Sequence, residues 1–169
     1  MRISKGITSA LVVGLSLVAI SAQAQTNSAT INATATVLSP ITVTGAQNLD
    51  FGNVTPGVAK GVAVTSASAG RFDVTNQANS NLSLTFTLPT NLASGGNNLP
   101  IATWTGHHSF TNSPTGGSNF TPSASATNIA ASASNTGNLY VFIGATVTPG
   151  AGQAAGSYTA PVGMTVVYF

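Results

Sequence analysis

The chain has 169 residues, with four Lys or Arg, two Asp or Glu, and no cysteine. This length fits a single domain, and the scarcity of charge leaves no basic surface for nucleic acid or anionic lipid. The lack of cysteine excludes thiol chemistry and thiolate metal sites.

The N-terminus has the features of a secretory signal peptide. Arg2 and Lys5 form a positive region, residues 7–20 are apolar, and Ala22-Gln23-Ala24 is a small-residue cleavage site. The apolar run is short for a membrane span, so we expect cleavage after Ala24 and no membrane span afterwards. The sequence therefore predicts an exported protein that ends in the periplasm, at the cell surface or in the medium.

Residues 25–38 contain an alternating segment that predicts a β-strand. Apolar residues occupy every second position from 29 to 37 and Asn or Thr fills the positions between, with Ile31, Ala33, Ala35 and Val37 on the apolar face. Two interpretations stay open. The segment is either the first strand of its own domain or a donor strand that these four residues anchor in the next subunit.

The rest of the chain, residues 39–169, predicts a sandwich of short strands separated by turn residues. Alternation or β-branched and aromatic residues predict strands at 41–44, 49–52, 62–64, 71–75, 82–88, 99–105, 139–147 and 157–169. Residues 90–98 are expected to form a loop. The low-complexity stretch 111–138 leaves room for short strands around Phe120 and Ile129.

The segment 139–147 is apolar on both alternating faces, which predicts burial or coverage on both sides. We expect it to form a hairpin with the final strand. About eight short strands and no helical pattern after the signal predict an all-β, antiparallel, immunoglobulin-like β-sandwich.

The last fourteen residues, 156–169, carry the most regular alternation near a terminus. Gly156 is fourteenth from the end, Tyr168 is penultimate, and Val162, Met164 and Val166 lie on the face of Tyr168. This pattern resembles the C-terminal signature of bacterial chaperone–usher pilins. The resemblance implies that a periplasmic chaperone reads this strand, that an outer-membrane usher assists assembly, and that the strand borders a groove accepting a neighbour's strand.

A second motif, Leu49-Asp-Phe-Gly52 followed by Val54 and Pro56-Gly57, resembles secreted bacterial pilin-like sandwiches. It is similar to fimbrial and spore-coat U proteins and to an uncharacterised family of exported domains that carries LDFG. That family shares an Ala/Thr-rich first strand and a turn like Gly152-Gln-Ala-Ala-Gly-Ser-Tyr158. The chain departs from typical pilins because it has no disulfide and its first strand is rich in alanine.

The chemical inventory argues against an enzyme. There is no Glu, and Asp50 and Asp73 are the only carboxylate side chains. His107 and His108 are adjacent, so on a strand they face opposite sides and cannot easily share one metal. We expect no catalytic residue, no cofactor and no metal site.

Three functions fit these patterns. The first is a structural subunit of a surface fibre, pilus or coat that assembles with copies of itself by strand addition. The second is a self-contained exported adhesin or matrix module that binds glycan or protein through Trp104, Tyr140 and the 111–138 loop. The third is an inert coat protein without a specific ligand.

Overall fold

A computed structural model describes residues 27–169, and the predicted signal peptide lies outside this range. The chain divides into two units, Met1–Thr36 and Val37–Phe169. In the first unit, residues 27–36 form no strand and are exposed. The second unit holds all the strands.

Ten strands build the second unit, and no helix occurs within residues 27–169. None of the described elements is therefore a helix able to cross a membrane. The strands are β1 (Thr42–Gln47), β2 (Lys60–Val62), β3 (Gly70–Thr75), β4 (Leu82–Thr87), β5 (Asn91–Ser94), β6 (Asn97–Ser109), β7 (Ser118–Phe120), β8 (Thr127–Ile129), β9 (Asn138–Val147) and β10 (Gly163–Tyr168).

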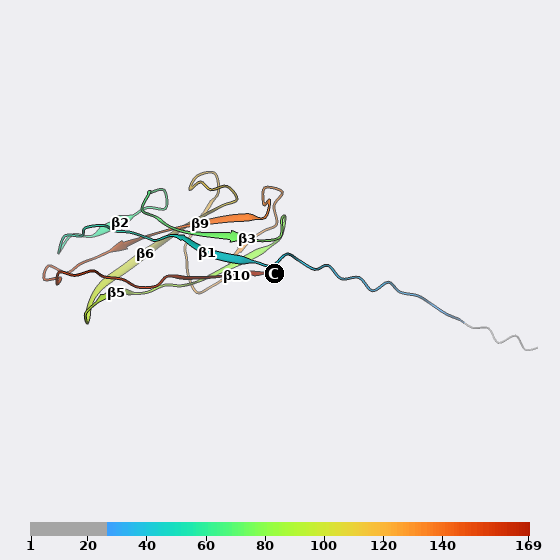
Figure 1. Cartoon of the computed structure of the whole chain (residues 1–169), viewed down its shortest axis with the longest axis horizontal. Helices are drawn as coiled ribbons and strands as arrows, with labels where there is room; N and C mark the ends of the chain where they lie inside the picture. The colour runs from blue at the N-terminus through green and yellow to red at the C-terminus, as the bar shows by residue number, and fades with distance from the viewer. Residues whose placement is uncertain (1–26) are drawn as a thin grey trace, which may run out of the picture. The chain divides into compact units, whose positions relative to one another are not determined.

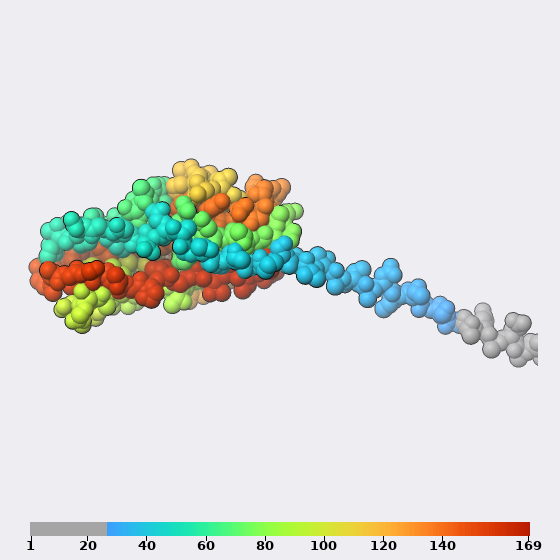
Figure 2. Space-filling model, in the orientation of Figure 1, coloured from blue at the N-terminus to red at the C-terminus, as the bar shows by residue number. Residues whose placement is uncertain are grey.

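The strands form two antiparallel sheets, which confirms the predicted all-β class (Figure 1). The larger sheet has the order β1-β3-β9-β6-β5, with β2 also paired to β9 and β7 to β6. The smaller sheet has the order β10-β4-β8. Figure 2 shows the segment that contains β1 running alongside the C-terminal segment.

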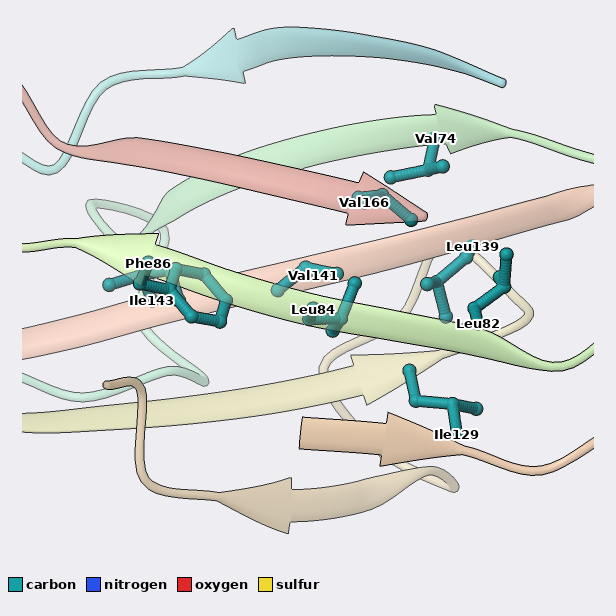
Figure 3. Packing of buried hydrophobic residues seen from close by; sticks show 9 residues of the cluster. All are labelled: Val74, Leu82, Leu84, Phe86, Ile129, Leu139, Val141, Ile143 and Val166. Carbon is teal, nitrogen blue, oxygen red and sulfur yellow. The ribbon is translucent and has the colours of Figure 1, made fainter. Parts of the chain in front are cut away.

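The main core lies between the two sheets, where alternate residues of facing strands meet (Figure 3). Leu82, Leu84 and Phe86 of β4 point inward, as their period of two predicts. From the facing sheet come Val141 and Ile143 of β9, 0% and 1% exposed. A second cluster of Leu99, Ile101, Ala145 and Val147 packs beside the loop that carries Leu49 and Phe51.

Strand β9 is buried on both faces, as its sequence predicts. Leu139, Val141 and Ile143 face the core, while Phe142 on the other face is 7% exposed beside the ring of His107. The hairpin predicted between β9 and the final strand is wrong. Both edges of β9 already have partners, β6 on one side and β3 and β2 on the other, so β10 pairs with β4 instead.

Two local predictions are also wrong. Residues 90–98, predicted as a loop, contain β5, whose tight hairpin to β6 turns at Gly95 and Gly96 with φ of 51° and 88°. Residues 49–52, predicted as a strand, form a loop in which Leu49 and Phe51 pack against the second cluster.

The strand predicted over residues 29–37 is not formed within the single chain. The structure pairs it with no other strand, and Ile31 and Val37 are 94% and 92% exposed. An isolated alternating segment gains nothing from its pattern, because a strand needs a neighbour for its backbone hydrogen bonds.

Candidate functional site

The two flanks of the sandwich differ in how the sheets meet. On one flank, β5 pairs with β6 of the larger sheet, and Ala93 exchanges two 3.0 Å backbone hydrogen bonds with Thr159 ahead of β10. On the other flank, β1 pairs only with β3 and β10 only with β4 among the described residues. This second flank is therefore an open seam between two strand edges.

A groove of about 1190 Å³ opens near the end of this seam. One wall is the end of β1 and the loop 48–56, and the other is the segment 153–162. Its floor includes Phe72, Leu99, Ile101 and Ile143. The groove thus reaches between the sheets to residues of both core clusters.

The first wall owes its shape to the Leu-Asp-Phe-Gly sequence. The Asp50 carboxylate accepts a 2.7 Å hydrogen bond from the Gly52 amide, and Gly52 takes a left-handed φ of 58° that favours glycine. The Asp50 amide donates to the Ser68 carbonyl at 3.0 Å. This turn lets Leu49 and Phe51 pack beside the groove, and Asp50 is the one charged residue in the lining.

The second wall is held by Tyr158 and two neighbours. The Tyr158 hydroxyl donates to the Ala154 carbonyl at 2.7 Å and accepts from the side-chain Nε2 of Gln153 at 2.8 Å. Gly156 lies close to Ser94, because a Cβ there would be 2.7 Å from the Ser94 hydroxyl and this side chain would have to move. Gly156 and Val162, two residues of the predicted acceptor strand, therefore line the groove.

The other residues of the predicted acceptor strand lie farther along, within β10. Val166 is in the main core, and Met164 and Tyr168 pack against it. The Tyr168 hydroxyl donates to the Ser39 carbonyl at 2.8 Å and accepts from the Gln77 amide at 2.6 Å. The Ser39 hydroxyl and amide in turn donate to Gln77 Oε1 at 2.9 and 3.3 Å. We call Ser39, Gln77 and Tyr168 the clamp.

The predicted anchors Ile31, Ala33, Ala35 and Val37 occupy no site in the structure. All four are exposed and contribute to neither core cluster. Their side chains are therefore free of packing in the single chain.

The two aromatic residues predicted as a ligand surface are not brought together. Trp104 packs against both core clusters, because β6 has an irregular register between Ala102 and Thr105, with Thr103 at a φ of 52°. Tyr140 alternates with the inward Leu139 and Val141, so it faces the opposite side of the larger sheet.

His107 and His108 lie on opposite faces of β6, as adjacent strand residues do. His107 Nδ1 is 2.8 Å from the Asn119 side-chain oxygen, and the His108 ring lies 6.0 Å from that of Phe120. Burial and the charge that His107 can carry lower the pKa of His108 below its usual 6.5. Among the described residues no group of three potential ligands could hold a metal.

Sequence reasoning missed the clamp and most of the groove. Ser39 and Gln77 stand 38 residues apart, and nothing in their local sequence indicates that they meet. The LDFG motif, predicted as a strand, instead forms a loop that lines the groove. Its Asp-x-Gly spacing is typical of a side-chain-capped turn and could have revealed the wall it forms.

A family model described as a domain of unknown function, DUF4402, matches residues 41–168. No curated protein and no solved structure shows significant similarity to the chain. The match fits the expected resemblance to an uncharacterised family, gives no support to the resemblance to fimbrial and spore-coat U proteins, and covers nearly the whole strand-bearing unit.

Proposed function

The chain belongs to the DUF4402 family, and from its own geometry we propose that it is a non-enzymatic structural subunit of a bacterial surface fibre, pilus or coat. Subunits join when residues 29–37 of one copy add a strand along the open seam of the next. The observation that carries this proposal is the coexistence of an unpaired alternating segment and an unfilled groove in one chain.

The seam offers backbone groups to an added strand. β1 and β10 each have one hydrogen-bonded neighbour among the described residues, so the other edge of each has unpaired amides and carbonyls. Natural sheets protect such edges, because an open edge is a template for another chain. β1 also lacks protection by burial, since all six of its residues are exposed.

The groove and the segment match in polarity. The floor is formed by apolar side chains, and Asp50 at the wall is its one charged residue. Residues 29–37 hold no charge and present Ile31, Ala33, Ala35 and Val37 on one face. Extended, these nine residues span about 30 Å at about 3.3 Å each. Small residues between two larger ones suit a narrow space between sheets.

The export predicted from the sequence supports the same function. The signal-like residues 1–24 fit delivery to the periplasm and cell surface. The pilin-like pattern at 156–169 makes a periplasmic chaperone and an outer-membrane usher the partners that we propose besides further copies of the chain. The adhesin alternative has less support, because Trp104 packs against the core clusters while Tyr140 lies on the opposite face of the larger sheet.

The test uses the protein recovered from producing cells and run on a gel without boiling. We expect a ladder of multimers that collapses on boiling. Ile31→Asp should abolish the ladder, because it places a charge on the inserted apolar face. Thr34→Asp is the matched control, since it adds the same charge to the opposite face.

A synthetic peptide of residues 25–38 completes the test. It should bind the Ile31→Asp protein, whose groove is intact. Polymers formed by Ile31→Asp, or a wild-type monomer that ignores the peptide, would overturn the proposal.

A further inference from the structure

We propose that the clamp of Ser39, Gln77 and Tyr168 decides which copy receives the N-terminal segment, by preventing residues 29–37 from folding back into their own groove. This inference rests on the proposed function and concerns the control of strand addition.

Length does not prevent self-insertion. The segment joins the sandwich at Ser39, and the groove begins near Gly45 and Gln47 of β1. These positions are six and eight residues beyond Ser39, about 20–26 Å along an extended strand. A nine-residue segment spans about 30 Å, so after a reversal at residues 38–41 it could run along β1 as far as the groove.

Self-insertion would also be favoured by concentration. For a segment tethered by a short linker, the effective concentration of its own binding site is about millimolar. A neighbouring copy in a micromolar solution offers a site about a thousandfold more dilute. Without a structural obstacle, therefore, the closed monomer should prevail over the polymer.

The clamp supplies that obstacle at the residue where the reversal would occur. Both backbone polar groups of Ser39 are engaged, its amide with Gln77 Oε1 at 3.3 Å and its carbonyl with the Tyr168 hydroxyl at 2.8 Å. The next residue, Pro40, fixes its own φ and restricts Ser39 to extended conformations. A chain reversal would have to rotate Ser39 and break these hydrogen bonds.

The clamp also joins both sides of the seam. Tyr168 belongs to β10, Gln77 follows β3, and Ser39 precedes β1. The hydrogen bonds of Tyr168 therefore tie the edge of the smaller sheet to the edge of the larger one at the end remote from residues 45–56 and 153–162. The seam is closed at this end and open at the other.

The experiment compares wild type, Tyr168→Phe and Gln77→Ala by light scattering after size-exclusion chromatography and by hydrogen exchange of residues 29–37. Tyr168→Phe keeps the ring and removes the hydroxyl, whereas Gln77→Ala leaves Tyr168 intact. Ser80→Ala is the control, because its hydroxyl donates to the Gln77 carbonyl at 2.6 Å without touching Ser39.

We expect both clamp variants to shift the population from multimer to monomer by tenfold or more, with residues 29–37 protected from exchange in the monomer. Ser80→Ala should resemble wild type. If wild type and both clamp variants form the same multimers, the clamp inference is wrong and the proposed function stands. If wild type is a monomer with residues 29–37 unprotected, the proposed function itself fails.

Discussion

The segment 29–37 and strand β10 both place apolar residues at every second position. β10 pairs with β4 over six residues, which leaves Val166 8% exposed, whereas Ile31 stays 94% exposed. β10 presents Met, Val and Tyr to a core, and the segment presents Ile, Val and three Ala to solvent. Alternation gives a segment the capacity to pair, but the partner strand decides whether a strand forms.

Shortening Leu84, the β4 residue paired with Val166 of β10, should have the largest effect on stability. Leu84 lies opposite Val166 and is fully buried, so Leu84→Ala should lower the free energy of unfolding by about 2–5 kcal/mol. Urea unfolding followed by the fluorescence of Trp104 measures this loss. Thr85→Ala, on the other face of the same strand, is the control and should cost far less. Equal losses would mean that the main core does not stabilise β10.

Loss of one hydroxyl at the end of β10 should have a smaller effect. Tyr168→Phe removes the hydrogen bonds to the Ser39 carbonyl and from the Gln77 amide, and should lower the free energy of unfolding by about 1–3 kcal/mol. Unfolding of the protein truncated before residue 38 isolates this cost from assembly. An unchanged midpoint would show that water replaces the hydroxyl without loss.

Acid should weaken the domain that holds β10 and leave the segment 29–37 unaffected, since the segment contains no titratable side chain. The pKa of His108 is lowered in the folded protein, so below about pH 6.5 the unfolded chain binds a proton more readily than the folded one. The contribution of His108 to the free energy of unfolding should therefore be fully present above pH 6.5. It should decline as the pH falls toward the lowered pKa of His108 in the folded protein. His108→Gln should flatten this part of the pH profile, and an unchanged profile would contradict the assignment.

The smallest effect is expected at the unpaired segment. Ile31→Ala should change the free energy of unfolding of the dilute monomer by less than about 0.5 kcal/mol, because the side chain is 94% exposed. Chemical denaturation at low protein concentration checks this. A loss approaching that of Leu84→Ala would mean that the segment packs within its own domain.

The sequence predicted the class of fold, the strands β3 and β4, whose residues alternate, and β9, whose residues are apolar on both faces. It missed β5 because Asn, Gly and Ser are typical of loops, and here the hairpin partner β6 overrides that preference. The predicted partner of β10 was wrong because strand pairing depends on which strand edges are free in the folded sheet. A local sequence pattern does not contain that information. The clamp was hidden for the same reason, since Tyr168 and Ser39 are 129 residues apart.

Residues 27–169 carry four charged side chains, those of Asp50, Lys60, Arg71 and Asp73, and Arg71 pairs with Asp73 at 2.8 Å. Added salt acts on proteins largely by screening charges over about 8–10 Å at moderate ionic strength. With so few charges there is little to screen, and the apolar contacts and backbone hydrogen bonds that hold the sheets do not depend on them. Folding and strand pairing should therefore be nearly the same at low and at moderate ionic strength.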